Sequence, residues 1–115
     1  MDTSKPILER LMRVIESRKA HRPSGSYTVE LLGGGIQQVT SKIREEAEEL
    51  IEAATDMGCS SPRFVIHEAA DLLYHTLVLL AACDISFEDV EAELETRFGK
   101  SGLVEKAGRK PRAKG

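Results

Sequence analysis

One segment, residues 64–83, is apolar nearly all the way round when it is wound as an α-helix. A soluble chain has to cover such a helix on most sides, so we expect it to lie at the centre of the fold. The chain has 115 residues, which is enough for one domain with one modest core. Only 4% of the residues are aromatic and none is Trp. Aliphatic residues must therefore build the core, and this composition favours helices over strands.

Helical periodicity also marks the first half of the chain. Apolar residues repeat at helical spacing over residues 5–20 and again over residues 36–57. Between these segments we expect a short helix over residues 29–32, which Ser26 or Thr28 can cap. Three consecutive glycines then separate the short helix from the long one, and we expect a flexible joint there.

The C-terminal part of the chain predicts one further helix. Ser86 suits its N-cap and Asp89 its third position, and the helix should end near Gly99. We find no strand-type alternation of useful length. The sequence therefore predicts an all-α fold, a bundle of four to five helices, with one domain over residues 1–105.

Charge is distributed unevenly along the chain. The whole chain has 16 basic and 19 acidic residues, for a net charge of −3. Residues 106–115 contain five of the basic residues and none of the acidic ones. The folded part is therefore strongly acidic, which argues against a nucleic-acid-binding surface. We expect residues 106–115 to form a mobile basic tail.

The cysteines and the apolar stretches predict the compartment. Cys59 and Cys83 form no close pair of the kind found in redox or zinc sites, and reduced thiols suit the cytosol. The N-terminus lacks the apolar core of a signal peptide. The most apolar stretch, residues 72–83, is too short to span a bilayer and contains His75. We therefore expect a cytoplasmic protein that does not associate with membranes.

Helical geometry separates the acidic residues of the long helix. At about 100° per residue, Glu46 and Glu49 lie on one flank of the apolar stripe, together with Lys42. Glu45 points almost directly away from that stripe. Taken alone, this pattern also fits a solvated face on which Lys42 and Glu46 form an ordinary i, i+4 ion pair.

The apolar segment 64–83 carries a second acidic pair. Four polar residues fall within one narrow stripe of its helix: His67, Glu68, Asp71 and His75. Burying unpaired carboxylates is costly, so Glu68 and Asp71 need a counter-charge from lysine, arginine or a metal. His75 could donate a hydrogen bond to a phosphate or to a carboxylate. It could equally be a core histidine whose hydrogen bonds are satisfied inside the protein.

The two acidic pairs, Glu46-x-x-Glu49 and Glu68-x-x-Asp71, can face each other across an antiparallel helix hairpin. Four carboxylates around one cleft suit Mg²⁺, a hard cation that takes oxygen ligands and bridges to substrate phosphates. A metal held in this way can polarise a phosphoryl oxygen and lower the pKa of a bound water. These motifs therefore indicate the chemistry of phosphoanhydride hydrolysis.

Four motifs follow one another along the chain: Ser26-Tyr27-Thr28, Lys42-Ile43-Arg44-Glu45-Glu46-Ala47-x-Glu49, Glu68-Ala69-Ala70-Asp71-Leu72-Leu73-Tyr74-His75 and Glu93-Leu94-x-x-Arg97. With them the chain resembles the MazG-like all-α nucleoside triphosphate pyrophosphohydrolase superfamily and, within it, the phosphoribosyl-ATP pyrophosphohydrolases. The resemblance covers about residues 5–105, with its motifs in order and at the expected spacing.

This resemblance implies a function. The enzyme would hydrolyse the α–β phosphoanhydride of the nucleotide phosphoribosyl-ATP to phosphoribosyl-AMP and pyrophosphate, the second step of histidine biosynthesis. The implied catalytic residues and Mg²⁺ ligands are Glu46, Glu49, Glu68 and Asp71. The implied substrate-binding residues are Lys42, Ser26, Tyr27, His75 and Arg97. Glu45 could assist a second metal or the attacking water.

The resemblance also implies an assembly of two or more chains. The apolar helix over residues 64–83 gives an independent reason for a homodimer, since the other short segments cannot cover all of it.

Two other functions are open at this point. The chain could be a related house-cleaning enzyme that hydrolyses dUTP or another nucleotide. It could also be a helical interaction module without activity, whose carboxylates pair with lysines. The second alternative predicts that Glu46, Glu49, Glu68 and Asp71 do not converge.

Overall fold

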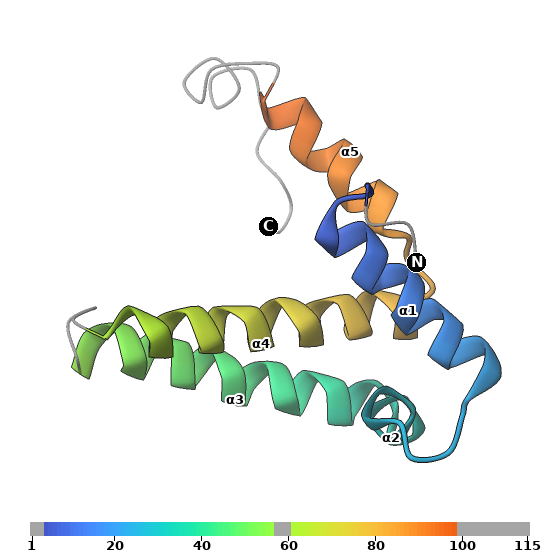
Figure 1. Ribbon diagram of the computed structural model, residues 1–115, viewed down its shortest axis with the longest axis horizontal. Coiled ribbons are helices and arrows are strands. Elements are labelled where there is room, and N and C mark those ends of the chain that lie inside the picture. The colour runs from blue at the N-terminus through green and yellow to red at the C-terminus, as the bar shows by residue number, and fades with distance from the viewer. Residues whose placement is uncertain (1–3, 57–60, 99–115) are drawn as a thin grey trace, which may run out of the picture. The chain divides into compact units, whose positions relative to one another are not determined.

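The computed structural model describes residues 4–56 and 61–98, and within these ranges all regular secondary structure is helical. Figure 1 shows the helices in chain order. They are α1 (Ile7–His21), α2 (Tyr27–Gly33), α3 (Gly35–Asp56), α4 (Pro62–Ala82) and α5 (Phe87–Phe98). The chain divides into two compact units between Ile85 and Ser86, so that α1 to α4 belong to the first and α5 to the second. The predicted all-α fold is confirmed.

The short second helix is capped as the sequence suggests. Of the two candidate caps, Ser26 takes the N-cap position of α2, and its Oγ accepts a hydrogen bond from the N–H of Val29 at 3.3 Å. This bond satisfies one of the backbone donors that a helix leaves free at its start. Gly35 then has a φ of +81°, a backbone conformation that glycine adopts without strain, at the joint between α2 and α3.

The first helix is fastened to the end of α4 by one lysine. The Nζ of Lys19 donates to the carbonyl of Ala81 at 2.7 Å and pairs with the Asp84 carboxylate at 2.5 Å. The Ala81 carbonyl lies in the last turn of α4, where helical carbonyls lack partners within their own helix. Lys19 therefore joins α1 to α4 and satisfies one of these groups.

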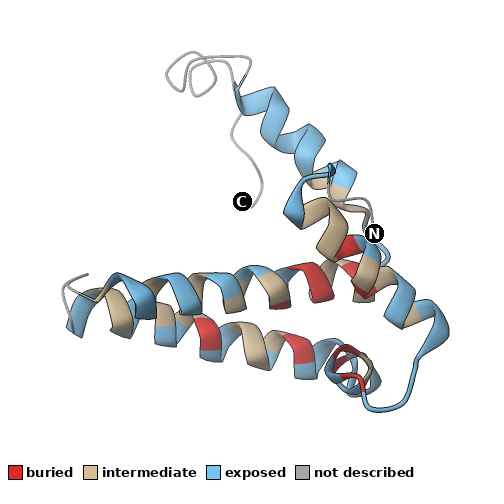
Figure 2. Ribbon diagram, viewed as in Figure 1, coloured by how far each residue is buried: buried red, intermediate tan, exposed pale blue. Residues whose placement is uncertain are grey.

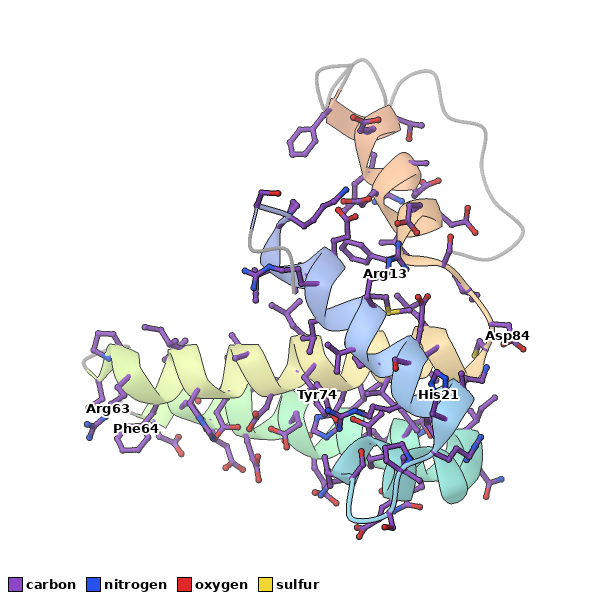
Figure 3. All side chains as sticks on the ribbon, turned by 45° about the vertical axis from the view of Figure 1, so that its right-hand side comes forward. Arg13, His21, Arg63, Phe64, Tyr74 and Asp84 are labelled. Atoms are coloured by element: carbon purple, nitrogen blue, oxygen red, sulfur yellow. The ribbon has the colours of Figure 1, made fainter. Side chains whose placement is uncertain are left out.

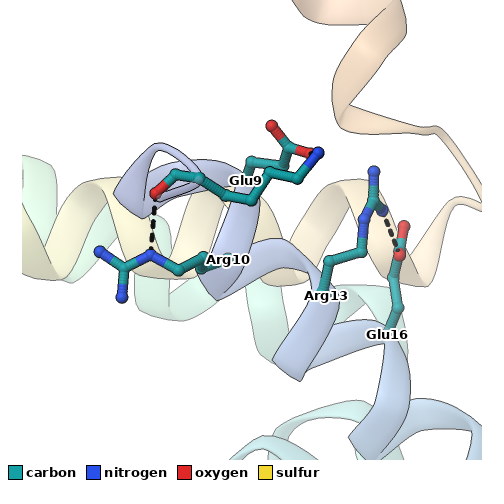
Figure 4. A network of polar contacts seen from close by, with 5 residues as sticks. Glu9, Arg10, Arg13 and Glu16 are labelled. Atoms are coloured by element: carbon teal, nitrogen blue, oxygen red, sulfur yellow. Dashed lines mark hydrogen bonds and ion pairs between the residues drawn. The ribbon is translucent and has the colours of Figure 1, made fainter. Parts of the chain in front are cut away.

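Other charged residues of α1 make local contacts. Figure 4 shows Arg10, whose Nε donates to the Lys5 carbonyl at 2.9 Å, and Arg13, which pairs with Glu16 at 2.6 Å. Exposed pairs of this kind contribute about 0–1 kcal/mol, so they support the helix without determining the fold.

The hydrophobic core lies where α1 and α2 pack against a long hairpin formed by α3 and α4. Figure 1 shows α3 and α4 side by side, and Figure 2 shows most of the buried residues towards the end of the hairpin that meets α1 and α2. The most fully buried large side chains are Met12, Ile15, Leu31, Val39 and Val78. Four of the five are aliphatic, as the composition predicts, and the fifth is the thioether Met12.

Within one chain, α4 is covered on only part of its surface. Its buried residues are His75, Leu77, Val78 and Ala81, all in its second half. Ile66 is 67% exposed and Leu73 is 50% exposed. Burial of this helix on most sides, as the sequence predicts, is therefore not achieved by a single chain.

The whole of α4 is also longer than the apolar stretch considered in the sequence. By length and composition alone, α4 could cross a membrane. The core helix of a soluble protein meets the same criteria, so length and composition do not distinguish the two cases.

The second compact unit contains α5. Ser86 caps this helix, because its Oγ accepts a hydrogen bond from the N–H of Asp89 at 3.2 Å, as the sequence predicts. Arg97 pairs with Glu93 at 3.0 Å, one turn earlier on the same helix. The predicted tail, residues 106–115, lies outside the described residues, as does Cys59.

Candidate active site

Three carboxylates converge between α3 and α4. One oxygen from each of Glu46, Glu49 and Glu68 lies within 4.8 Å of the other two. Glu46 and Glu49 are nearly one turn apart on α3, which places them on the same flank of that helix. Glu68 comes from α4, the other arm of the hairpin. The structure therefore brings together three of the four carboxylates in the two motifs.

Asp71 belongs to a second group that shares Glu68. Ligand atoms of His67, Glu68 and Asp71 also lie within 4.8 Å of one another, and the Nε2 of His67 is 3.2 Å from the Oδ2 of Asp71. The sequence pattern places His67 on the polar stripe of α4 but assigns it no role. Its i, i+4 spacing from Asp71 is the signal that predicts this contact.

The carboxylate cluster includes a deeply buried acid. Glu46 is 8% exposed. Among the residues that the structure describes, neither the Oε1 of Glu46 nor the Oε1 of Glu68 has a hydrogen-bond partner, although both atoms are buried. Such an atom costs free energy, because it has lost its water without gaining a partner.

Burial has a direct effect on the charge of Glu46. Burial, the neighbouring Glu68 carboxyl group and the negative charges of Asp71 and Glu49 together raise the pKa of Glu46 from 4.5 to about 7. Every one of these causes disfavours the charged carboxylate. A bound cation would favour the charged form, and the oxygen donors of the cluster fit a divalent cation.

Lys42 lies on the same helix as Glu46 but pairs with a different acid. Its Nζ donates to the Oε1 of Glu45 at 3.2 Å, rather than forming the i, i+4 pair with Glu46. This hydrogen bond, together with the nearby Tyr27 and Glu46, raises the pKa of the Lys42 ammonium. Glu45 is exposed, in agreement with its helical angle.

His75 is engaged inside the protein. It is 4% exposed, its Nδ1 lies 2.8 Å from the backbone carbonyl of Asp71, and its Nε2 lies 3.0 Å from the hydroxyl of Tyr27. Both ring nitrogens therefore have partners. Of the two interpretations of His75, the structure favours a core histidine with satisfied hydrogen bonds.

The α2 side of the site is built from the Ser26-Tyr27-Thr28 motif. Ser26 is buried, and its hydroxyl also accepts a hydrogen bond from Arg18 at 3.3 Å. Thr28 and Tyr74 bring their hydroxyl oxygens within 2.5 Å. The sequence pattern does not predict this α2–α4 contact of Tyr74, which is labelled in Figure 3. Of the three motif residues only Tyr27 presents a large exposed surface, at 47%.

An open hollow of about 350 Å³ adjoins the carboxylates. It is lined by Glu49, Glu52, Ala53, Asp56, Phe64 and Glu68. The guanidinium of Arg63 lies 5.7 Å from the centre of the Phe64 ring, and both side chains are seen at the start of α4 in Figure 3. A small molecule in this hollow would contact two members of the cluster, Glu49 and Glu68.

Comparison with known proteins agrees with this arrangement. A family model described as phosphoribosyl-ATP pyrophosphohydrolase matches residues 8–98. The chain is 52% identical over 102 residues to the phosphoribosyl-ATP pyrophosphatase of Rhodopirellula baltica, covering 89% of this chain and 85% of that protein. It is 47% identical over 110 residues to the phosphoribosyl-ATP pyrophosphatase of Trichlorobacter lovleyi, covering 96% of this chain and 99% of that protein. It is 46% identical over 103 residues to the phosphoribosyl-ATP pyrophosphatase of Cereibacter sphaeroides, covering 90% of this chain and 97% of that protein. The matched segment includes every carboxylate of the cluster, and the chain belongs to the phosphoribosyl-ATP pyrophosphohydrolase family.

Proposed function

We propose that this protein hydrolyses phosphoribosyl-ATP to phosphoribosyl-AMP and pyrophosphate, in the second step of histidine biosynthesis. The family match and the names of the relatives support this activity. The structural observation that carries the proposal is the convergence of carboxylate oxygens from Glu46, Glu49 and Glu68. Among the described residues, the buried Oε1 atoms of Glu46 and Glu68 have no hydrogen-bond partner. Cleavage at the α–β phosphoanhydride is the step that yields these two products.

The proposed Mg²⁺ ligands are Glu46, Glu49, Glu68 and Asp71. Carboxylate oxygens are the donors that Mg²⁺ prefers, and a cation beside Glu46 and Glu68 offsets the cost of their burial. Bound there, Mg²⁺ supplies polarisation of a phosphoryl oxygen and a bound water of lowered pKa. Asp71 joins through Glu68, which is common to both groups of ligands.

Among the other proposed site residues, some supply positive charge and others form the approach to the site. Lys42, exposed enough to leave Glu45, supplies positive charge for the substrate phosphates, and Arg97 is proposed as a second such group. Tyr27 lines the approach from α2, and Ser26 holds it there by capping the helix on which Tyr27 is the first residue. A polyphosphate needs such cations, because an acidic cluster alone repels it.

We further propose a cytoplasmic homodimer. Ile66 and Leu73 are seven residues apart, so they lie on one face of α4. At least half of each side chain is exposed in a single chain. Exposed apolar side chains on one face of a long helix favour association with another apolar surface. A second copy packed on this face would complete the burial that the composition of α4 requires.

The experiment that tests the function is an assay of pyrophosphate release. Phosphoribosyl-ATP, ATP and dUTP are supplied separately, each with Mg²⁺ and with EDTA. We expect metal-dependent release from phosphoribosyl-ATP and little from the other two. Faster release from dUTP would favour the house-cleaning alternative. Release from phosphoribosyl-ATP that is unchanged by EDTA would remove the metal from the proposal.

The non-catalytic alternative predicts that Glu46, Glu49, Glu68 and Asp71 do not converge. The grouping of Glu46 and Glu49 with Glu68, and of Asp71 with Glu68, supports the enzyme over an interaction module. Lys42, the lysine of α3, pairs with Glu45 instead.

A further inference from the structure

The hollow beside the carboxylate cluster combines an acidic lining with one aromatic side chain. Of the described residues that line it, four are acidic, the others are Phe64 and Ala53, and none is basic. Its volume of about 350 Å³ is near the lower end of the range for small-molecule sites, roughly 300–1,000 Å³. The hollow therefore has room for part of a nucleotide. Its negative lining repels a polyphosphate and suits a part of the substrate that is flat and positively charged.

Two of the acids, Glu52 and Asp56, line the hollow but do not belong to the carboxylate cluster. Both are exposed, and neither forms a hydrogen bond or an ion pair with another residue of the described ranges. Exposed carboxylates of this kind are negatively charged at neutral pH. The end of the hollow that they line therefore attracts a cation.

Phe64 supplies the aromatic surface of the hollow and is 46% exposed. The guanidinium of Arg63 lies 5.7 Å from the centre of this ring, and Figure 3 labels both side chains at the start of α4. The face of an aromatic ring attracts cations in this way because it is negative relative to the edge. Arg63 does not itself line the hollow. The ring is thus accessible from the hollow to a second planar cation.

The spacing along α4 relates this ring to the carboxylate cluster. Phe64 precedes Glu68 by four residues, which corresponds to a rise of about 6 Å along the helix. One ribose separates the base of a nucleotide from its α-phosphate. A base stacked on Phe64 would therefore place the α-phosphate near Glu49 and Glu68, the two proposed metal ligands that also line the hollow.

The base of phosphoribosyl-ATP differs in charge from the base of ATP. Its phosphoribosyl group is attached to N1 of the adenine ring, and a substituent on this nitrogen leaves the base protonated near neutral pH. The positive charge is delocalised over N1, C6 and the exocyclic nitrogen, so the group is a planar amidinium that resembles a guanidinium. The base of ATP has no substituent on N1 and is neutral at pH 7.

We propose that the hollow is the subsite for the cationic base of phosphoribosyl-ATP, with Phe64 stacked on the base and with Glu52 and Asp56 facing its positive charge. These three residues then determine specificity, because the neutral base of ATP gains nothing from the two carboxylates. The hollow is open, so the phosphate of the N1 substituent extends into solvent. The inference rests on the proposed function, which names the substrate.

Steady-state kinetics test the roles of the ring and of the carboxylates. A cation–π contact at a partly exposed site corresponds to roughly a three- to tenfold change in affinity. Phe64→Leu should raise KM for phosphoribosyl-ATP by about this factor and leave kcat nearly unchanged, because the base does not react. Phe64→Trp keeps an aromatic face and should keep a low KM. Glu52→Gln should raise KM about threefold, whereas Glu48→Gln, at an exposed position of α3 outside the hollow, should not.

A binding measurement tests the same subsite without turnover. The chain contains no Trp, so the indole of Phe64→Trp is a fluorescent reporter within the hollow. It is titrated in EDTA with N1-methyl-AMP, whose base is cationic, and with AMP, whose base is neutral. We expect N1-methyl-AMP to quench the indole at about tenfold lower concentration than AMP. Adding Glu52→Gln should reduce this preference, and adding Glu48→Gln should leave it unchanged.

The two measurements separate this inference from the proposed function. Equal quenching by the two nucleotides, no quenching by either, or an unchanged KM in Phe64→Leu would overturn the subsite. If the unmodified protein released no pyrophosphate from phosphoribosyl-ATP, the proposed function would fail. The fluorescence titration would then still decide whether the hollow prefers a cationic base.

Discussion

Glu46 on α3 and Glu68 on α4 place carboxylate oxygens within 4.8 Å of each other, and each residue has a buried Oε1 without a hydrogen-bond partner in the described part of the chain. Two acids so placed repel each other and disfavour the charged form of Glu46. This pair lowers the stability of the folded chain, and a bound cation would make its contribution to stability favourable.

Replacing Glu46 by glutamine should separate stability from activity. The amide has the same shape but no charge to bury, so Glu46→Gln should stabilise the metal-free protein at pH 8 by about 1–3 kcal/mol. The same change removes a proposed metal ligand and should abolish pyrophosphate release. Urea unfolding in EDTA measures the first effect. Glu48→Gln, on an exposed position of α3, is the control and should stay within about 0.5 kcal/mol. A destabilised Glu46→Gln protein would contradict the argument.

The stability of the metal-free protein should depend on pH through Glu46. Its pKa is 4.5 when unperturbed and about 7 in the fold, so the folded state binds more protons between these values. The Glu46 contribution to stability is therefore present below pH 4.5 and is lost as the pH rises to about 7, by an amount on the order of 3 kcal/mol.

Subtracting the pH profile of Glu46→Gln from that of the unmodified protein isolates this contribution. Both profiles are measured by urea unfolding in EDTA, and adding Mg²⁺ should flatten the difference. If the unmodified protein instead gained stability relative to Glu46→Gln between pH 4.5 and 7, burial would not be the dominant effect on the pKa of Glu46.

The acids of α4 should be required for turnover but not for folding. Glu68→Gln and Asp71→Asn preserve side-chain volume and remove one negative charge each, which weakens metal binding. We expect pyrophosphate release to be lost in both, with the helical circular dichroism and the cooperative unfolding retained. Their affinity for Mg²⁺, measured by calorimetry, should fall in parallel. Retained activity in both variants would exclude these residues from the metal site.

The cap of α2 should contribute measurably to stability. Ser26→Ala removes the oxygen that accepts from the N–H of Val29, and losing such a cap costs about 1 kcal/mol. Thermal unfolding of Ser26→Ala should therefore show a lower Tm. Ser41→Ala is the matched control, because Ser41 lies at an exposed position within α3 and alanine is favoured there. Equal effects of the two changes would mean that the cap contributes nothing.

The exposed face of α4 should hold the two copies of the proposed homodimer together. Ile66→Lys and Leu73→Lys each place a charge on that face, and burying it against an apolar surface is unfavourable. Sedimentation should give a mass of two chains for the unmodified protein and of one chain, 12.7 kDa, for the variants. Glu48→Lys changes the charge of an exposed position on α3 and should leave the mass unchanged. A monomeric unmodified protein at micromolar concentration would contradict the dimer.

Much of the secondary structure follows from local patterns. The helix starts at Ser26 and Ser86 depend on a side chain and a backbone N–H three residues away, so residue spacing predicts them. The same holds for the faces of α3 and α4, where helical spacing places Glu46 beside Glu49 and Glu68 beside Asp71. Residues that are close along the chain have few alternative arrangements, and the sequence is sufficient for these features.

Tertiary structure decided contacts that residue spacing leaves open. Helical spacing allows Lys42 to pair with either Glu45 or Glu46, and only the packed hairpin, which buries Glu46 and leaves Glu45 exposed, selects Glu45. The role of His75 was also undecided in the sequence, because its partner Tyr27 is 48 residues away along the chain. The sequence by itself determined which acids lie on which helix faces. The packing of α3 on α4 decided which oxygens lose their water, and burial is the physical cause of the raised pKa and of the affinity for a cation that we propose.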